Sequence, residues 1–403
     1  MARMIGAGFV VKSLILVVLL VPVAGCWSSK ELNELAITMG MAIDQYEGNK
    51  FLVTVQVVDS GEVSASKGTL GRSPVILYRA KGDTVSEALQ RMSTSSPRAI
   101  YNSHLRVLVI GETLARKGIK DVLDYISRNW QFRTDFPVII AKGAQAGDTL
   151  RVLTPIESIP AIQMLNAIEN SKKYWAPTVA IHFDDLIRAM VSKGRQAVVT
   201  GILLTGDAEE GGKRSNLATT LPKSRLRLIG LSAFKKDKLI GWLNENDSRG
   251  YNFIMGQVYK STGNITCDDG KLLALEVLNE KSKLKASFQG GKLRLAADMK
   301  VEAKIAEVAC DIKLTRDETI RQLEAKAEKR LREIAQSALD RIQHDLKVDV
   351  FGYGEVVHRH YPKYWRQVKA NWDEQFSNTP VDLQVDVKIR LLGTVTEALE
   401  RVD

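Results

Sequence analysis

The residue with the clearest chemistry in this sequence is Cys26, which closes a short apolar segment near the N-terminus. Basic residues precede an apolar run at residues 14–21, Pro22 ends this run, and Val, Ala and Gly then lead directly to the cysteine. This layout is typical of a secretory signal whose cleavage leaves cysteine as the new N-terminus. The cysteine thiol can carry a diacylglyceryl group through a thioether bond. The sequence therefore predicts a signal peptide at residues 1–25 and lipid attachment at Cys26.

The same segment has two alternative interpretations, a transmembrane helix and a plain secretory signal with a soluble product. A spanning helix needs about 20 mostly apolar residues, whereas residues 12–30 include Pro22, Gly25 and a pair of serines. The apolar part is therefore too short to span. The lipoprotein interpretation is favoured over the plain signal because small residues lead directly from the apolar run to a cysteine. Two acyl chains also anchor stably, where one myristoyl chain gives only marginal binding.

The other two cysteines, Cys267 and Cys310, form a possible pair outside the membrane if Cys26 is lipidated. A disulfide between them would crosslink one domain. Two buried free thiols are the alternative, and the sequence does not decide between them.

Catalytic and metal-binding patterns have little support in the sequence. It contains neither the HExxH pattern of zinc proteases nor the GxSxG pattern of serine hydrolases. The best remaining metal candidates are Glu355, His358 and His360, because histidines two apart share a face on a strand. Nothing nearby supplies the further ligands, so we expect a structural role for them. We therefore expect no catalytic residue, no cofactor and no metal site.

An aromatic cluster near the C-terminus stands out, because aromatic residues make up only 6% of the chain. Its members are Tyr361, Tyr364, Trp365, Trp372 and Phe376. The two tryptophans are seven residues apart, which places them on the same side of a helix. One interpretation is that this face packs onto the sheet of the terminal domain. The functional interpretation is an exposed patch of Trp365, Trp372 and Tyr364 that binds a protein partner.

Composition describes an ordinary globular protein with room for two or three hydrophobic cores. The chain has 403 residues, of which 45% are hydrophobic and 26% charged, and its formal net charge is +10. The basic excess is spread along the chain without an arginine-rich block. It is compatible with an anionic membrane surface. Nucleic acid is not an expected partner, because an exported protein rarely meets it.

The elements that must position these residues fall into three consecutive domains after the signal peptide. We expect an N-terminal α+β domain at residues 26–195, a small middle α+β domain at 196–262 and a C-terminal domain at 263–403. Alternating apolar residues at 51–57 predict a half-buried strand in the first domain. The middle domain begins with a continuously apolar run at 197–204.

The C-terminal domain has the clearest pattern. We expect an antiparallel meander, then a long amphipathic helix from about 317 to 346, and a final strand at 381–391. The predicted strands of the meander are residues 271–279, 283–288 and 292–308. Together the three domains predict an α+β protein, with mixed and antiparallel sheets and helices packed on them.

Several short motifs along the chain, each weak alone, are jointly specific. They are Gly25-Cys26-Trp27, Glu31-Leu32 and residues 40–44, 103–107, 234–239, 241–243 and 248–250, with Asp349, Phe351, Gly352, His358, Pro362, Trp365, Trp372 and Phe376 near the end. With these motifs the sequence resembles the Ger(x)C family, the lipoprotein C subunits of nutrient germinant receptors in endospore-forming bacteria. Ser28 departs from the aspartate that often follows the tryptophan in that family.

The resemblance implies a three-domain α+β subunit on the outer face of the spore inner membrane. It would assemble there with two integral-membrane subunits, of the A and B types, and respond to nutrients. No enzymatic activity is implied. The alternative is a solute-binding lipoprotein of a transport system, but that class usually has two βαβ lobes around a hinge. The antiparallel final third expected here does not match such a lobe.

Overall fold

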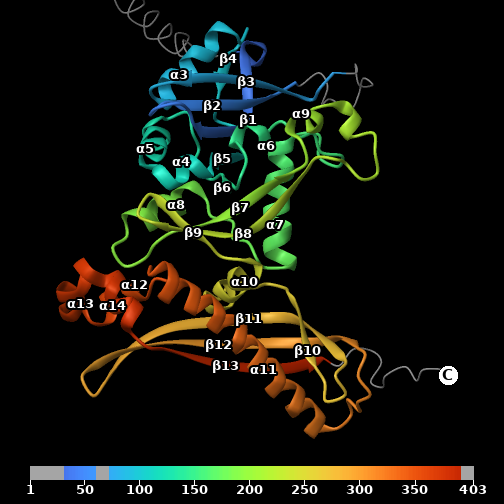
Figure 1. Ribbon diagram of the computed structural model, residues 1–403, viewed down its shortest axis with the longest axis vertical. Helices are drawn as coiled ribbons and strands as arrows, with labels where there is room; N and C mark the ends of the chain where they lie inside the picture. The colour runs from blue at the N-terminus through green and yellow to red at the C-terminus, as the bar shows by residue number, and fades with distance from the viewer. Residues whose placement is uncertain (1–30, 60–71, 392–403) are drawn as a thin grey trace, which may run out of the picture.

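The protein folds around two β-sheets that lie one above the other along the long axis of the molecule (Figure 1). The computed structural model describes residues 31–59 and 72–391. Within these residues the N-terminal sheet has nine strands and the C-terminal sheet has four. Helices pack on both sheets, which confirms the expected α+β class with mixed and antiparallel sheets.

The N-terminal sheet is antiparallel at its two sides and parallel in the middle. Its order is β3-β2-β1-β5-β6-β7-β8-β9, with the short β4 paired to the end of β1. The pairs from β1 through β5 and β6 to β7 are parallel. Its strands are β1 (Leu35–Gln45), β2 (Phe51–Val58), β3 (Val75–Gly82), β4 (Ala99–Tyr101), β5 (Val107–Gly111), β6 (Val138–Ala141), β7 (Val198–Thr205), β8 (Arg225–Lys235) and β9 (Lys238–Trp242).

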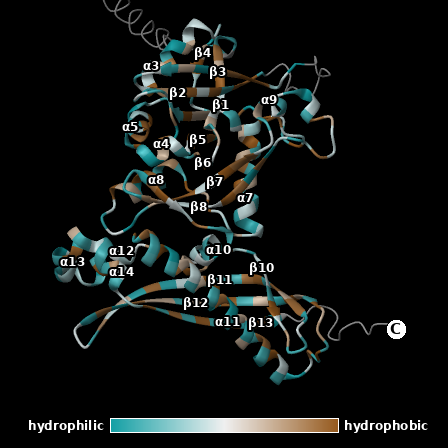
Figure 2. Cartoon of the chain, viewed as in Figure 1, coloured by the Kyte–Doolittle hydropathy of each residue, from teal (hydrophilic) through white to brown (hydrophobic). Residues whose placement is uncertain are grey.

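The central strands are apolar because helices cover both faces of this sheet. Every residue of β5 and β6 is buried, and the hydrophobic residues gather on these strands (Figure 2). One face packs against α3, α4, α5 and α8, and the other against α6 and α7. These helices are α3 (Val85–Arg91), α4 (Glu112–Lys117), α5 (Lys120–Arg128), α6 (Ala146–Thr149), α7 (Pro160–Tyr174) and α8 (Phe183–Val191).

The strands predicted for the middle domain extend the N-terminal sheet. β7 pairs with β6 through Ile140 and Gly201, and β8 and β9 continue from β7. The boundary expected between residues 195 and 196 therefore lies within one hydrogen-bonded sheet, and the three-domain division stays a prediction. The connections in this half also contain η2 (Leu32–Glu34), η3 (Met92–Thr94), α9 (Ala208–Gly211) and η4 (Arg214–Asn216).

The C-terminal sheet is built on one long hairpin. The strands are β10 (Thr262–Thr266), β11 (Leu272–Gln289), β12 (Lys292–Val308) and β13 (Val381–Leu391), in that order across the sheet. The two strands expected at 271–279 and 283–288 form the single strand β11, with an irregularity near Asn279. Gly290 and Gly291 make the turn at φ of 55° and 76°, in the left-handed region that glycine adopts at little cost.

Helix α11 (Asp317–Asp340) and the π-helical turn η5 (Arg341–Leu346) confirm the long helix expected in this domain. Leu323, Ala327 and Leu331 form part of its buried stripe. Helix α10 (Glu245–Ile254) lies between the two sheets and is buried along most of its length. One hydrophobic core runs from β8 through α10 to β11 and β12, so the two sheets share packed side chains.

Candidate functional site

The aromatic cluster of the C-terminus lies in three short helices beside the C-terminal sheet. They are α12 (Tyr353–His360), α13 (Pro362–Val368) and α14 (Trp372–Asn378), with the turn η6 (Lys369–Asn371) between the last two. Pro362 begins α13, a position that suits proline because its missing N–H has no partner there anyway. The rings of Trp365 and Trp372 meet edge to face, with centroids 5.3 Å apart. Both side chains are buried in the shared core.

A buried carboxylate, Asp349, fixes this cluster in place. One of its oxygens accepts a hydrogen bond from the backbone N–H of Gly352 (2.8 Å). The other accepts from the N–H of Gly354 (2.7 Å) and from the indole Nε1 of Trp372 (2.8 Å). These three bonds orient the start of α12 and the first residue of α14. Burial raises the pKa of Asp349 to about 6, although the hydrogen bonds lower it.

The segment between α8 and β7 joins the N-terminal sheet to this carboxylate. The N–H of Gln196 donates to the carbonyl oxygen of Asp349 (2.8 Å), and the hydroxyl of Ser192 donates to Glu355 (2.8 Å). Between these contacts two backbones pass very close together. A Cβ added to Gly194 would lie 2.6 Å from the carbonyl carbon of Gly354, so the approach requires glycine.

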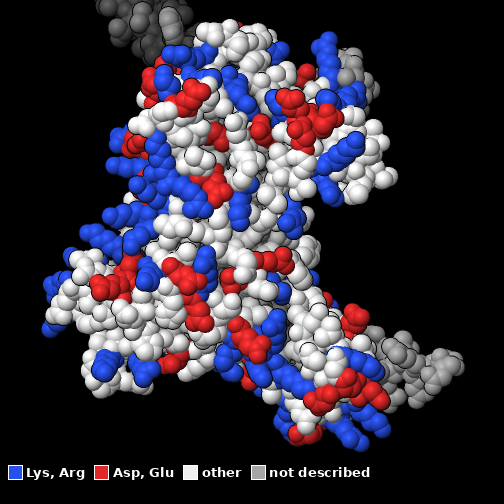
Figure 3. Space-filling view, viewed as in Figure 1, with Lys and Arg blue, Asp and Glu red and all other residues white. Residues whose placement is uncertain are grey.

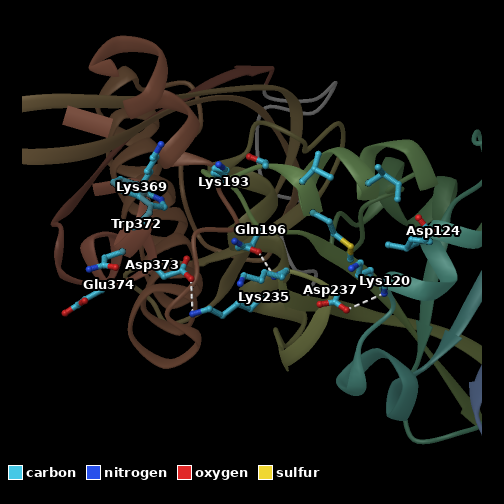
Figure 4. Close-up of a pocket in the computed structure, with 18 of the residues that line it drawn as sticks. Lys120, Asp124, Lys193, Gln196, Lys235, Asp237, Lys369, Trp372, Asp373 and Glu374 are labelled. Carbon is cyan, nitrogen blue, oxygen red and sulfur yellow. Dashed lines mark hydrogen bonds and ion pairs between the residues drawn. The ribbon is translucent and has the colours of Figure 1, made fainter. Parts of the chain in front are cut away.

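A groove of about 900 Å³ opens beside this contact; we name it the junction groove. Figure 4 shows its walls, which come from α5, the end of α8 and the segment after it, the β8–β9 turn, and the region of η6 and α14. Its apolar lining includes the side chains of Leu123, Ile187 and Met190. The polar lining consists of Lys120, Asp124, Ser127, Ser192, Lys193, Gln196, Lys235, Lys236, Asp237, Lys369, Asn371, Asp373 and Glu374.

Positive charge is in excess in this groove. Lys235 crosses it to pair with Asp373 (2.9 Å), and Asp124 is paired with Arg128 (2.8 Å). Asp237 and Glu374 are the other acidic side chains of the lining. Four lysines of the lining form no ion pair within the described part of the chain: Lys120, Lys193, Lys236 and Lys369. Figure 3 shows lysine and arginine gathered on this flank of the molecule.

The comparisons with known proteins cover both halves of the chain. A family model described as the spore germination protein N-terminal domain matches residues 28–204. A second, described as spore germination B3/GerAC-like, C-terminal, matches residues 229–393. The chain belongs to the GerAC-like spore germination family. This confirms the resemblance expected from the short motifs.

Individual relatives agree with this family along nearly the full chain. Spore germination protein KC of Bacillus subtilis is 28% identical, with 95% of this chain and 96% of that protein covered. Spore germination protein B3 of the same organism is 25% identical, with 94% and 96% covered. The crystal structure of the GerBC protein matches with a TM-score of 0.54 at 21% identity and covers 87% of this chain and 96% of that one, which shows a common fold.

In this GerAC-like protein the two tryptophans do not form an exposed patch. Trp365 and Trp372 are 4% and 3% exposed, because they pack on each other and Trp372 is bonded to Asp349. Of the two interpretations given for these tryptophans, packing in the core is confirmed and the exposed patch is wrong. Tyr364 is half-buried against Phe288, with ring centroids 5.0 Å apart. Partner binding by this face stays a prediction.

The two histidines lie on a helix rather than a strand. His358 and His360 belong to α12, where residues two apart point to different sides. The expected shared face is therefore wrong, and His358 instead packs beside Trp365 at 5.7 Å between ring centroids. Their alternation with valine and arginine looks like a strand in the sequence, but the turn fixed by Asp349 begins a helix.

Cys267 and Cys310 form a disulfide, which resolves the alternative that the sequence left open. Asp269 lies beside both sulfur atoms. Because both sulfurs are in the disulfide, this trio offers no thiolate to a metal ion. Cys26 lies outside the described residues, so its lipid attachment stays a prediction. Among residues 31–59 and 72–391, no helix combines the length and the apolar character that crossing a membrane requires.

Sequence reasoning missed Asp349 as the centre of the site and missed the junction groove. Asp349 stands three residues before Gly352, and aspartate at the first position with glycine at the fourth is a turn signal. This signal could have been found. The groove could not, because Lys235 and Asp373 meet there from distant parts of the chain.

Proposed function

We propose that this chain is the membrane-anchored, non-catalytic lipoprotein subunit of a nutrient germinant receptor. It would attach through Cys26 to the outer face of the spore inner membrane and act through contacts with two integral-membrane subunits of the A and B types. The observation that carries this proposal is the match of both family models, which together span most of the chain. The names of the relatives, spore germination proteins KC and B3, support the role in germination.

The tether would place one end of the molecule close to the membrane. Four residues lie between Cys26 and Glu31, the first described residue, so five steps from one Cα to the next connect them. At about 3.5 Å per residue, this chain reaches at most roughly 18 Å. Restriction to a membrane plane makes the encounter with a neighbouring subunit effectively intramolecular, so weak interfaces suffice. The alternative of a solute-binding lipoprotein is less well supported, because the two sheets differ in size and topology and do not form paired βαβ lobes.

The replacement Cys26→Ala tests the anchoring. We expect it to lower the amount of protein in the spore membrane fraction by about ten-fold or more, since the apolar contribution of the acyl chains is lost. The germination response to at least some nutrients should fall with it. Immunoblots of membrane and soluble fractions, together with nutrient-triggered germination assays, measure the two effects.

Ser28→Ala is the matched control, because it changes a neighbouring residue and leaves the cysteine in place. It should behave as the wild type. Wild-type retention of the Cys26→Ala protein in the membrane fraction would contradict the anchoring.

A further inference from the structure

We propose that the junction groove binds an acidic segment of one of the integral-membrane partner subunits. This inference rests on the proposed function and assigns a place on the surface to the partner contact. The groove has room for such a segment, since its volume of about 900 Å³ lies at the upper end of the range for binding clefts.

The lining of the groove suits a chain that is both acidic and partly apolar. Lys193, Lys236 and Lys369 are exposed, and each comes from a different wall. The lining also includes the apolar side chains of Ile187 and Val191, the latter 74% exposed. Carboxylates of a bound segment would meet the lysines, while its apolar side chains would cover this exposed surface.

The shape of the groove favours a protein segment over an anionic lipid surface. The groove is concave and lies between the two sheets, whereas the first described residues lie at the far end of the N-terminal sheet (Figure 1). A flat bilayer that faces the tethered end does not enter a cleft between the sheets. A peptide loop can, and its backbone could also bond to polar groups such as Gln196 and Asn371.

An occupant of this groove would contact both halves of the protein at once. Lys193 and Lys236 belong to the N-terminal half, whereas Lys369 belongs to the helices held by Asp349. The ion pair between Lys235 and Asp373 already bridges the same gap. Binding would therefore hold the two sheets in a fixed relation, which gives the partner a means to sense or set their arrangement.

The test reverses three charges in the full-length, lipid-anchored protein. The groove variant is Lys193→Glu, Lys236→Glu and Lys369→Glu. The control variant is Lys283→Glu, Lys292→Glu and Lys300→Glu, which makes the same charge change at exposed lysines of β11 and β12, outside the groove lining. Each protein is purified from detergent-solubilised spore membranes, and the co-purified integral-membrane subunits are quantified.

We expect the groove variant to retain about ten-fold less of a partner subunit, and the control variant to stay within about two-fold of the wild type. Both variants should remain in the membrane fraction and should unfold at the wild-type temperature. Equal co-purification with both variants would overturn the proposal. The proposed function would still be supported after that result if the Cys26→Ala protein were lost from the membrane fraction.

A second measurement distinguishes an acidic peptide from an anionic lipid as the occupant of the groove. A fluorescent poly-L-glutamate peptide is titrated into the detergent-purified full chain, and the groove variant should bind it about ten-fold more weakly than the control variant. Short-chain phosphatidylglycerol is the lipid probe. The proposal would be overturned if the protein bound this lipid but not the peptide and if the groove substitutions abolished the lipid binding. That result would identify a lipid site.

Discussion

At the scale of single residues, the carboxylate of Asp349 fixes the positions of α12 and α14 beside the junction groove. It is fully buried, and its three hydrogen bonds come from two backbone amides and one indole. Burial outweighs these bonds and raises its folded-state pKa to about 6. A raised pKa means that the folded protein takes up the proton more readily than the unfolded chain. The stabilising contribution of this group is therefore present below its unfolded pKa and is lost as the pH rises through about 6.

Asp349→Asn tests this titration. Both carboxylate oxygens of Asp349 accept hydrogen bonds from N–H donors, and in asparagine an NH₂ group replaces one of these oxygens. This NH₂ group cannot accept, so we expect a loss of about 1–3 kcal/mol in the free energy of unfolding. The wild type alone should lose roughly 1 kcal/mol between pH 5 and pH 7 from this group. The stability difference between wild type and variant should therefore be larger at pH 5 than at pH 7. Urea unfolding at both pH values measures it.

Asp311→Asn serves as the control for Asp349→Asn, because Asp311 is exposed. It should leave the pH profile of the wild type unchanged. A stability difference for Asp349→Asn that grows from pH 5 to pH 7 would show that the sign is wrong.

At the scale of elements, helix α11 protects the free edge of β13. The backbone N–H of Val387 donates to Glu328 (3.2 Å), and that of Ile389 donates to Glu324 (2.9 Å). These amides face away from β12 and would otherwise be available to another strand. Unpaired edge strands promote association between chains, and charged groups placed along an edge are a common protection.

Replacing both glutamates, in Glu324→Ala with Glu328→Ala, should leave the edge of β13 unpaired. We expect soluble aggregates or dimers to form, because two such edges can pair with each other. The matched control is Glu318→Ala with Glu333→Ala, two exposed glutamates of the same helix. Size-exclusion chromatography with light scattering compares the two. An edge variant that stays as monomeric as the control would contradict this role for α11.

The elements also show which structure a local pattern can predict. The alternation in residues 381–391 predicted β13, and the apolar stripe predicted α11, because each pattern depends only on neighbours in the chain. The parallel pairing of β13 with β12 was not predictable from this pattern. It depends on the path of the helices between them. The histidines of α12 were considered on a strand because apolar and polar residues alternate around them. Over so few residues, such an alternation also occurs in a helix.

At the scale of the whole molecule, the two sheets share one hydrophobic core through α10, and a few backbone contacts around Gly194 add a second connection. The sequence predicted a boundary at residue 195, where a new strand-rich unit begins. The structure places a close contact with the C-terminal half there, while β7 joins the N-terminal sheet. Such pairings between distant segments leave no local signal. For the same reason the junction groove was not predictable.

Gly194→Val tests how far the molecule depends on this contact. The new side chain would meet the backbone of Gly354, so we expect this contact to open while the shared core holds, and the free energy of unfolding to fall by about 2 kcal/mol or more. Gly263→Val is the control, because a Cβ there meets nothing within 4 Å and valine suits a strand. Urea unfolding should show this loss of stability for Gly194→Val alone. Equal stabilities for the two variants would contradict the importance of this contact.

The place of β13 after all the other described strands also sets an order on biosynthesis. By Trp242 the ribosome has delivered every strand of the N-terminal sheet, whereas β12 must wait for a neighbour that ends at Leu391. A nascent chain can thus complete its first half early, since domains tend to fold as they emerge. A product terminated before β13 would display an open edge on β12 to chaperones and proteases. Cellular surveillance of this protein would then act mainly on its second half.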